Sequence, residues 1–263
     1  MSRKLIVAEL QSTACSRKPL ATPSRDRTEQ GTLPHGVRGL MFDFGGVLYD
    51  DTVWRRWLLR LLSHLGLHAH YRSFFHVLDH EYLVQVYTGR ESFCDALSRF
   101  LRAAGLSRGQ VSEVLAACQG RRRELEQSTR PLPGVRGTLV RLRGMGLVLG
   151  LLSDSELGGE ELRERLDRFA TPDTFRAVVS STDVGCTKPS ALCYQRTLAD
   201  MELPADAVAY VGHDPAELAG ARRLGMATIA YNAPPETAAD VAIDRFEQLS
   251  DVVDPARSLA AAG

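Results

Sequence analysis

The segment Met41–Asp50, MFDFGGVLYD, joins a short apolar run to an acidic residue and a glycine turn. The apolar run, Gly39–Phe42, has the length and composition of a buried strand. Asp43 follows it at once, and the pair Gly45-Gly46 is a strong turn signal. The segment therefore predicts a short buried strand that ends by presenting Asp43 at the edge of a sheet.

After the breaker cluster Pro131–Gly134, apolar runs alternate with helical stretches. Short apolar strands separated by helices of ~10–15 residues indicate a parallel sheet with both faces covered. The sequence thus predicts an α/β fold with a Rossmann-like parallel sheet. The predicted strands are 147–152, 177–180, 207–211, 227–230 and 241–243, and the predicted helices are 135–144, 159–168, 190–200 and 215–224.

Residues 53–130 show helical periodicity and no strand signals. Apolar residues from Trp54 to Leu65 recur three and four positions apart, which places them on one face of a helix. Further helical pieces are predicted over 72–87, 91–104 and 109–127. We therefore expect an α/β core formed by 37–52 and 131–263, with 53–130 inserted as a helical domain.

Charge and hydropathy exclude several classes of protein. The 263 residues include 32 Lys+Arg and 32 Asp+Glu, so the formal net charge is zero. This balance argues against nucleic acid or an anionic membrane surface as the main partner. No apolar run reaches the ~18 residues of a membrane-spanning helix. Residues 1–36 combine scattered charges with Ser, Thr, Pro and Gly, a composition that predicts a disordered tail.

The cysteines indicate a reducing compartment. Their number is odd and no C-x-x-C pair occurs, so neither a disulfide framework nor a zinc site is predicted. Reduced thiols are typical of a cytoplasmic protein. The five cysteines are Cys15, Cys94, Cys118, Cys186 and Cys193.

Polar residues follow several of the predicted strands. Ser153–Asp154 follow the second strand, Lys188 lies in the loop after the third, and Gly212–Asp214 follow the fourth. In open α/β sheets, ligands bind beyond the carboxyl ends of the strands. A carboxylate at Asp43 that attacks, with a hydroxyl and an ammonium that hold the charge of the transferred group, suits an anionic substrate.

Lysine is rare in this chain, which makes Lys188 informative. The cations comprise 29 Arg and 3 Lys, and the other two lysines, Lys4 and Lys18, lie in the predicted tail. A compact ammonium fits between a carboxylate and a phosphoryl group, whereas a planar guanidinium does not. The retained lysine therefore favours a phosphoryl-binding role.

Four segments carry these residues in a fixed order. They are Met41–Asp50; Gly150–Ser155; Val184–Pro189 with Tyr194; and Tyr210–Asp214 followed by Gly220-Ala221 and Gly225-Met226. In order and spacing they resemble the haloacid dehalogenase (HAD) superfamily of hydrolases, in the form that has a helical cap inserted after the first motif. The resemblance covers about residues 37–245.

The resemblance implies a role for each site residue. Asp43 would be the nucleophile and form an aspartyl-phosphate. Ser153 would hydrogen-bond the phosphoryl oxygens, and Lys188 would neutralise the charge of the nucleophile and the phosphoryl group. Gly46 and Asp154 would join these two residues in binding the substrate.

The resemblance also implies a metal. Mg²⁺ would be held by the Asp43 carboxylate, the Gly45 backbone carbonyl and Asp214. The family usually has an aspartate where this chain has His213, and Asp214 is the nearest replacement, with Glu217 behind it. Because Mg²⁺ prefers oxygen and imidazole suits softer metals, three interpretations stay open: Mg²⁺ on Asp214, another divalent metal such as Mn²⁺, or weak or absent metal binding.

Gly45 is a second departure from the family pattern. Phosphatases of this family usually have an aspartate here, two residues after the nucleophile, that protonates the leaving group and later activates water. Glycine keeps the backbone carbonyl but lacks the acid and base, a contribution of ~10²–10⁴ in rate. The departure argues against a phosphomutase and favours substrates with a good leaving group.

Three functions compete at this point. The first is a metal-dependent phosphatase that acts on a small phosphorylated metabolite, with no nucleic-acid or membrane partner. The second is a 2-haloacid dehalogenase, because halide expulsion needs neither leaving-group protonation nor Mg²⁺. The third is a non-catalytic binding or regulatory protein with the HAD fold, against which the retention of Asp43, Ser153 and Lys188 argues. The sequence predicts no oligomeric state.

Charged residues of the helical segment allow two interpretations. Five histidines between 64 and 80 include the i, i+4 pairs His64/His68 and His76/His80, a spacing compatible with a two-histidine metal site but more typical of a solvated or substrate-facing surface. Arg55 and Arg56, just after the first motif, either contact substrate or lie on a solvated helix face.

Overall fold

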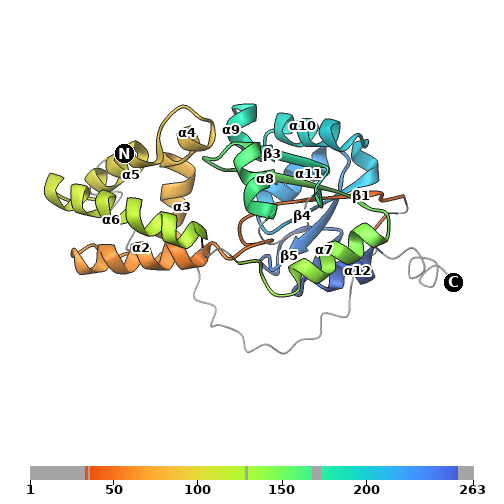
Figure 1. The fold of residues 1–263 in the computed structure, drawn as a ribbon, viewed down its shortest axis with the longest axis horizontal. Coiled ribbons are helices and arrows are strands. Elements are labelled where there is room, and N and C mark those ends of the chain that lie inside the picture. Colours follow the sequence, from red (N-terminus) through yellow and green to blue (C-terminus); the bar gives the residue numbers. More distant parts are fainter. Residues whose placement is uncertain (1–32, 35, 128–129, 168–172, 254–263) are drawn as a thin grey trace. The chain divides into compact units, whose positions relative to one another are not determined.

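The computed structural model describes residues 33–34, 36–127, 130–167 and 173–253, which form two compact units (Figure 1). One unit contains the described residues from Asp51 onward to 127. The other contains those before Asp51 and those from Arg130 onward. The predicted disordered tail lies almost entirely outside the described residues.

The second unit is built on a parallel sheet of six strands in the order β3-β2-β1-β4-β5-β6. The predicted α/β fold with a Rossmann-like sheet is therefore confirmed. The strand predicted to carry the nucleophile, β1, lies in the interior of the sheet. The strands are β1 Gly39–Phe42, β2 Val148–Ser153, β3 Ala177–Ser180, β4 Val208–Gly212, β5 Ala227–Tyr231 and β6 Val241–Ile243.

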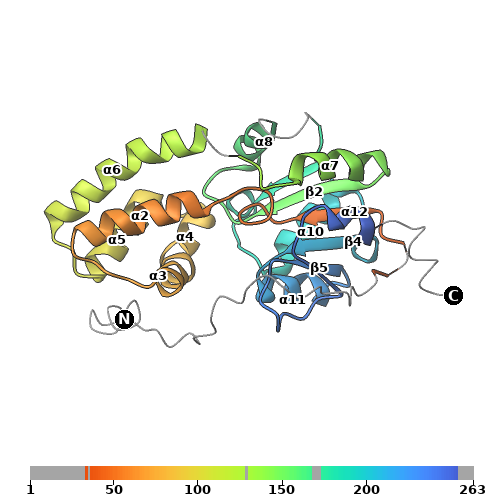
Figure 2. The ribbon, with the colours of Figure 1, turned by 90° about the horizontal axis from the view of Figure 1, so that it is seen from below.

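Helices cover both faces of this sheet, and Figure 2 shows α7 and α11 on opposite sides of it. Two short helices, α9 and α12, were not predicted from the periodicity, because four or five residues are too few to show it. The helices are α7 Val135–Gly144, α8 Gly159–Asp167, α9 Ser181–Val184, α10 Ala191–Met201, α11 Pro215–Arg223 and α12 Gln248–Val252, with a 3₁₀ turn at Ala205–Ala207.

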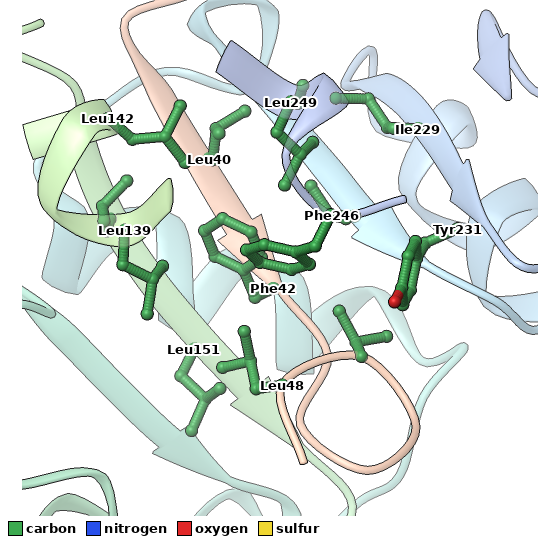
Figure 3. Packing of buried hydrophobic residues seen from close by; sticks show 14 of the residues in the cluster. Leu40, Phe42, Leu48, Leu139, Leu142, Leu151, Ile229, Tyr231, Phe246 and Leu249 are labelled. Atoms are coloured by element: carbon green, nitrogen blue, oxygen red, sulfur yellow. The ribbon is translucent and has the colours of Figure 1, made fainter. Parts of the chain in front are cut away.

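Successive side chains of β1 point to opposite faces of the sheet, so its residues contribute to two apolar cores. Leu40 and Phe42 point to the face covered by α7 and α12, whereas Met41 points to the face covered by α10 and α11. The Phe42 ring stacks on Phe246 with ring centroids 5.8 Å apart (Figure 3). Since both faces of β1 are packed, the end of the strand is held in place. Asp43 directly follows this strand, so its backbone is fixed by the packing of the sheet.

The first unit is helical and has its own apolar core. The predicted helical piece 72–87 is divided into α3, the π-turn η1 and α4, and the N–H of Leu83 donates to the carbonyl of Leu78 in that turn. Among the described residues, no helix is both long enough and apolar enough to cross a bilayer. The elements are α2 Thr52–His64, α3 Tyr71–Val77, η1 Leu78–Tyr82, α4 Val84–Tyr87, α5 Phe93–Ala103 and α6 Arg108–Gln127.

Candidate active site

Three strand ends bring the predicted site residues to one edge of the sheet. Asp43 follows β1, and its N–H donates to the carbonyl of Val211 in β4 at 3.0 Å. Ser153 is the last residue of β2, and Gly212 is the last residue of β4. Asp43 and Ser153 are buried, with 7% and 4% of their surfaces exposed. The strand-end geometry expected from the sequence is therefore present.

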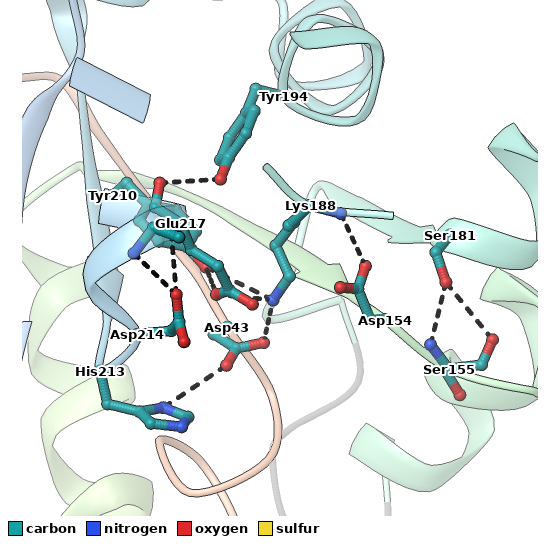
Figure 4. A network of polar contacts seen from close by, with 11 residues as sticks. Asp43, Asp154, Ser155, Ser181, Lys188, Tyr194, Tyr210, His213, Asp214 and Glu217 are labelled. Atoms are coloured by element: carbon teal, nitrogen blue, oxygen red, sulfur yellow. Dashed lines mark hydrogen bonds and ion pairs between the residues drawn. The ribbon is translucent and has the colours of Figure 1, made fainter. Parts of the chain in front are cut away.

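Lys188 reaches the same edge from the loop between α9 and α10. Its Nζ atom lies 2.5 Å from Asp43 Oδ1 and 3.1 Å from Glu217 Oε2 (Figure 4). Burial opposes the charged form of this side chain, but the carboxylates of Asp43 and Glu217 outweigh burial and raise the pKa of the Lys188 ammonium above its ordinary value. Lys188 is therefore a buried cation held against the predicted nucleophile.

Asp154 holds the backbone of the lysine loop in place. Its Oδ1 accepts a hydrogen bond from the N–H of Lys188 at 3.1 Å. Burial raises the pKa of the Asp154 carboxyl, although the nearby Lys188 opposes this shift. Asp154, predicted as a substrate-binding residue, thus has a visible contact with the loop. Next to it, the N–H of Ser155 donates to Ser181 Oγ at 3.0 Å, which links the end of β2 to α9.

Tyr210 and Glu217 form a second, buried part of the site. The Tyr210 hydroxyl donates to Glu217 Oε2 at 2.7 Å and lies 3.4 Å from Lys188 Nζ. Burial raises the pKa of Glu217, and the neighbouring carboxylates of Asp43 and Asp154 add to that shift against the opposing effect of Lys188. Burial likewise raises the pKa of Tyr210.

Tyr210 is not among the site residues predicted from the sequence, and Glu217 is expected there only as a neighbour of Asp214. The position of the Tyr210 ring depends on Gly212. A Cβ atom at this glycine would lie 2.6 Å from the Tyr210 ring. The glycine therefore leaves room for the ring beside the strand end, but this close approach is a tertiary contact that the sequence alone does not reveal.

Gly220 has a similar function on helix α11. A Cβ atom there would lie 2.8 Å from Pro189 Cβ and 3.0 Å from the Tyr194 hydroxyl. That hydroxyl donates to the backbone carbonyl of Glu217 at 2.8 Å. The small residue thus lets α11 pack directly against the loop that carries Lys188, whose peptide bond to Pro189 is cis.

His213 faces the side of Asp43 away from the lysine. Its Nδ1 atom lies 3.6 Å from Asp43 Oδ2, and its side chain is 45% exposed. Gly46 adopts a φ of +70°, and a Cβ atom on it would lie 3.4 Å from His213 Cε1. The glycine turn therefore passes close to the imidazole. The two oxygens of Asp43 face two different nitrogen groups, the Lys188 ammonium and the His213 imidazole.

Asp214 acts as the N-cap of α11. Its Oδ1 accepts hydrogen bonds from the N–H groups of Ala216 and Glu217 at 2.8 and 3.0 Å. Asp and Asn are preferred caps because they satisfy the free N–H groups of a first turn. The capping contact occupies one carboxylate oxygen of this predicted metal ligand.

The described residues fit Mg²⁺ poorly. No three of their His, Cys, Asp or Glu side chains are grouped so that they would hold a metal ion. One oxygen of Asp43 is paired with Lys188, its other oxygen faces an imidazole, and Asp214 caps a helix. Mg²⁺ demands an octahedral set of oxygen ligands, and the grouped side chains of the described residues do not supply one. The expected ligands Asp43, Gly45 and Asp214 therefore stay a prediction.

Arg55 and two of the clustered histidines contact other residues of the helical unit. Arg55 lies 2.9 Å from Asp51 and 2.7 Å from Asp79, and its guanidinium lies over the Phe75 ring. The five clustered histidines are all exposed, and the rings of His76 and His80 contact each other with centroids 4.6 Å apart. The exposure of these histidines, with no three metal-ligating side chains grouped among the described residues, favours a solvated or substrate-facing surface over a metal site.

Comparisons with known proteins agree with this architecture. A glyceraldehyde 3-phosphate phosphatase of Methanocaldococcus jannaschii is 29% identical over 133 residues, a match that covers 47% of this chain and 57% of that enzyme. The chain thus spans little more than half the length of this relative.

Solved structures share the fold. A predicted phosphoglycolate phosphatase from Haemophilus somnus superimposes with a TM-score of 0.62 and 16% identity, over 83% of this chain and 99% of that chain. An L-2-haloacid dehalogenase from Xanthobacter autotrophicus gives a TM-score of 0.60 and 16% identity, over 82% and 98%. The family model for haloacid dehalogenase-like hydrolases matches residues 37–225. With most of the chain matched, the protein belongs to the haloacid dehalogenase-like hydrolases.

Proposed function

We propose that the protein hydrolyses the phosphate ester of a small metabolite, with Asp43 as the nucleophile. The observation that carries this proposal is the buried pair of Asp43 and Lys188, 2.5 Å apart at the carboxyl edge of the sheet. The ammonium offsets the charge that accumulates when an anionic phosphate approaches a carboxylate. The similarity to a glyceraldehyde 3-phosphate phosphatase supports a phosphorylated metabolite as the substrate class.

The reaction has two steps. In the first, Asp43 Oδ2, the oxygen not paired with Lys188, attacks phosphorus in line and the bond from phosphorus to the ester oxygen breaks. In the second, water attacks the phosphorus of the aspartyl-phosphate, which releases phosphate and restores the carboxylate. The Lys188 ammonium and the Ser153 hydroxyl hold the charge of the phosphoryl oxygens in both steps. Every step uses residues of the chain itself.

The leaving group limits the range of substrates. Gly45 has no side chain that would protonate the departing oxygen, so the oxygen leaves as an anion or takes its proton from water. General acid catalysis contributes ~10²–10⁴ in rate where it is present. The proposal therefore favours esters whose alcohol is acidic, such as aryl esters, over simple alkyl esters.

Phosphate release from p-nitrophenyl phosphate and a panel of sugar and triose phosphates tests the proposal. We expect turnover by the wild type, loss of turnover in Asp43→Asn, and retained turnover in the matched control Asp200→Asn, whose carboxylate forms a surface ion pair with Arg196 on α10. Phosphate release that survives in Asp43→Asn, or no release from any substrate, would contradict the proposal.

Hydrolysis at carbon is the second candidate function. It is favoured by the lack of a carboxylate at both Gly45 and His213, because expulsion of halide needs neither a proton donor nor a divalent cation. Asp43 would then displace halide from carbon, and water would hydrolyse the resulting ester. Halide release from 2-haloacids in the presence of chelator, without phosphate release from any ester, would replace the first candidate by this one.

A further inference from the structure

Two cysteine sulfurs are in contact directly beside the lysine loop. Cys186 lies two residues before Lys188, and Cys193 lies in the first turn of α10. Their Sγ atoms are 3.2 Å apart, and the Cys193 thiol donates to the backbone carbonyl of Cys186 at 2.9 Å. Both thiols are free. We propose that Cys186 and Cys193 form a reversible disulfide under peroxide and that this bond switches the active site off by displacing Lys188.

The two thiols have different access to an oxidant. Cys186 is partly exposed, whereas Cys193 is fully buried in the core between α10 and the sheet. Burial, followed by the contact with Cys186, raises the pKa of the Cys193 thiol. Because peroxide reacts with exposed thiolates, we expect it to oxidise Cys186 first. Cys193, which is already in contact with Cys186, is then the cysteine that forms the disulfide with it.

The chemistry balances with a peroxide as the oxidant. Hydrogen peroxide oxidises the Cys186 thiolate to a sulfenic acid, and one water is released after protonation. The Cys193 sulfur then attacks the sulfenic sulfur, the S–O bond breaks, and a second water leaves with the Cys193 proton. The two thiols lose two electrons and two protons in total, and the peroxide is reduced to two waters. A thiol reductant reverses the reaction by exchange.

Formation of the bond moves the lysine loop. A disulfide has an S–S distance of about 2.05 Å, so sulfurs now 3.2 Å apart must approach by about 1.2 Å. Cys193 and its neighbour Tyr194 are fully buried, and the packing of α10 on the sheet restricts their movement. Most of the movement is therefore made by the partly exposed Cys186 and its loop, which shift toward α10.

The displacement acts on a catalytic contact. Lys188 lies two residues along the same loop, with its N–H on Asp154 and its Nζ on Asp43. A misplacement of about 1 Å at a reacting centre lowers rates by up to about 10²-fold. We therefore expect the disulfide form to turn over substrate at least about tenfold more slowly. This loss of rate rests on the proposed function, whereas the formation of the disulfide does not.

The test uses the full chain with Cys15 and Cys94 replaced by Ser, so that buried Cys118 is the one cysteine left besides the proposed pair. After treatment with hydrogen peroxide, we expect an intact mass lower by two hydrogens and a cross-linked peptide joining Cys186 to Cys193. Turnover of p-nitrophenyl phosphate should fall with the same time course and return with dithiothreitol. Cys186→Ser in this background should show neither the cross-link nor the reversible loss.

The outcomes distinguish a failure of the disulfide switch from a failure of the proposed phosphatase function. No cross-link at peroxide levels that oxidise Cys94 in the otherwise unchanged protein overturns the disulfide. A cross-link with unchanged turnover overturns the switch. If the untreated protein has no phosphatase activity, the cross-link in the mass spectrum still supports the disulfide, and the displaced lysine loop is then read from protection of its amide groups against hydrogen exchange. Unchanged protection overturns the displacement.

Discussion

The two oxygens of Asp43 face chemically different groups. Lys188 Nζ contacts Oδ1 at 2.5 Å, and His213 Nδ1 faces Oδ2 at 3.6 Å. The proposed phosphoryl-binding role of Lys188 relies on this contact with Asp43. His213 stands where the family resemblance implies a carboxylate, and its ring packs beside Gly46. At the scale of single residues, this asymmetry predicts how the site responds to metal and to an added acid.

His213→Asp should create affinity for Mg²⁺. The substitution replaces a nitrogen ligand by oxygens beside Asp43, and oxygen is what Mg²⁺ prefers. We expect the dissociation constant for Mg²⁺, measured by calorimetric titration, to fall at least about tenfold, which corresponds to about 1.4 kcal/mol. His213→Asn removes the imidazole without adding charge and is the control. Equal affinity of the wild type and His213→Asp would refute the argument.

Gly45→Asp should restore leaving-group protonation. Gly45 does not have the positive φ of Gly46, so its backbone conformation does not require glycine. We expect kcat to rise more on alkyl phosphates than on p-nitrophenyl phosphate, by at least about tenfold, because an acid helps poor leaving groups most. Parallel kinetics on the two ester classes check this, and equal gains on both would count against the leaving-group argument.

At the scale of elements, the placement of Lys188 depends on how closely helix α11 approaches its loop. Gly220 permits this approach, and Tyr194 joins the helix to α10 through the carbonyl of Glu217. The contact links two segments that are distant in the sequence. A methyl group added at Gly220 of α11 should therefore disturb the loop that carries Lys188.

Gly220→Ala should lower both stability and activity. The added Cβ atom meets Pro189 and Tyr194 at or below 3.0 Å, and overpacking typically costs about 1–3 kcal/mol. Gly137→Ala on α7 is the matched control, because nothing lies within 4 Å of its Cβ position and alanine favours a helix. Denaturant unfolding and turnover are the measurements. If Gly220→Ala resembles Gly137→Ala in both, the close approach is irrelevant.

The sequence predicts some elements better than others for a physical reason. The strands 39–42, 177–180 and 241–243 have the predicted bounds, because short apolar runs between turn signals have few alternatives. The π-turn Leu78–Tyr82 interrupts an apparently regular helical pattern, and a local pattern contains no sign of such an extra residue. Tyr210 was missed in the site because its contact with Glu217 depends on space left by Gly212, which only the folded chain defines.

At the scale of the whole molecule, the buried charges of the α/β unit connect stability to pH. Burial and neighbouring carboxylates raise the pKa of Glu217 from its ordinary value of 4.5 to about 8. Between these two pH values the folded protein keeps a proton that the unfolded chain has lost. The contribution of Glu217 to the free energy of unfolding is therefore full below pH 4.5 and is lost as the pH rises through about 8.

Glu217→Gln should flatten this dependence. Gln keeps an oxygen that accepts from the Tyr210 hydroxyl but has no proton to lose. We expect the free energy of unfolding of the wild type to fall by up to about 1.4 kcal/mol per pH unit within the window, relative to the variant. Urea unfolding from pH 5 to pH 8 measures this, with the exposed Glu164→Gln as control. Identical slopes in all three proteins would disprove the assignment.

The most direct measurement of the central claim is the covalent state of Asp43 during turnover. Rapid acid quenching of the enzyme with p-nitrophenyl phosphate, followed by mass spectrometry of the peptide that contains Asp43, should reveal one added phosphoryl group. The group should disappear as substrate is exhausted and should be absent in Asp43→Asn. Phosphate released with no phosphoryl group on Asp43 at any time, or with the group on another residue, would contradict the account.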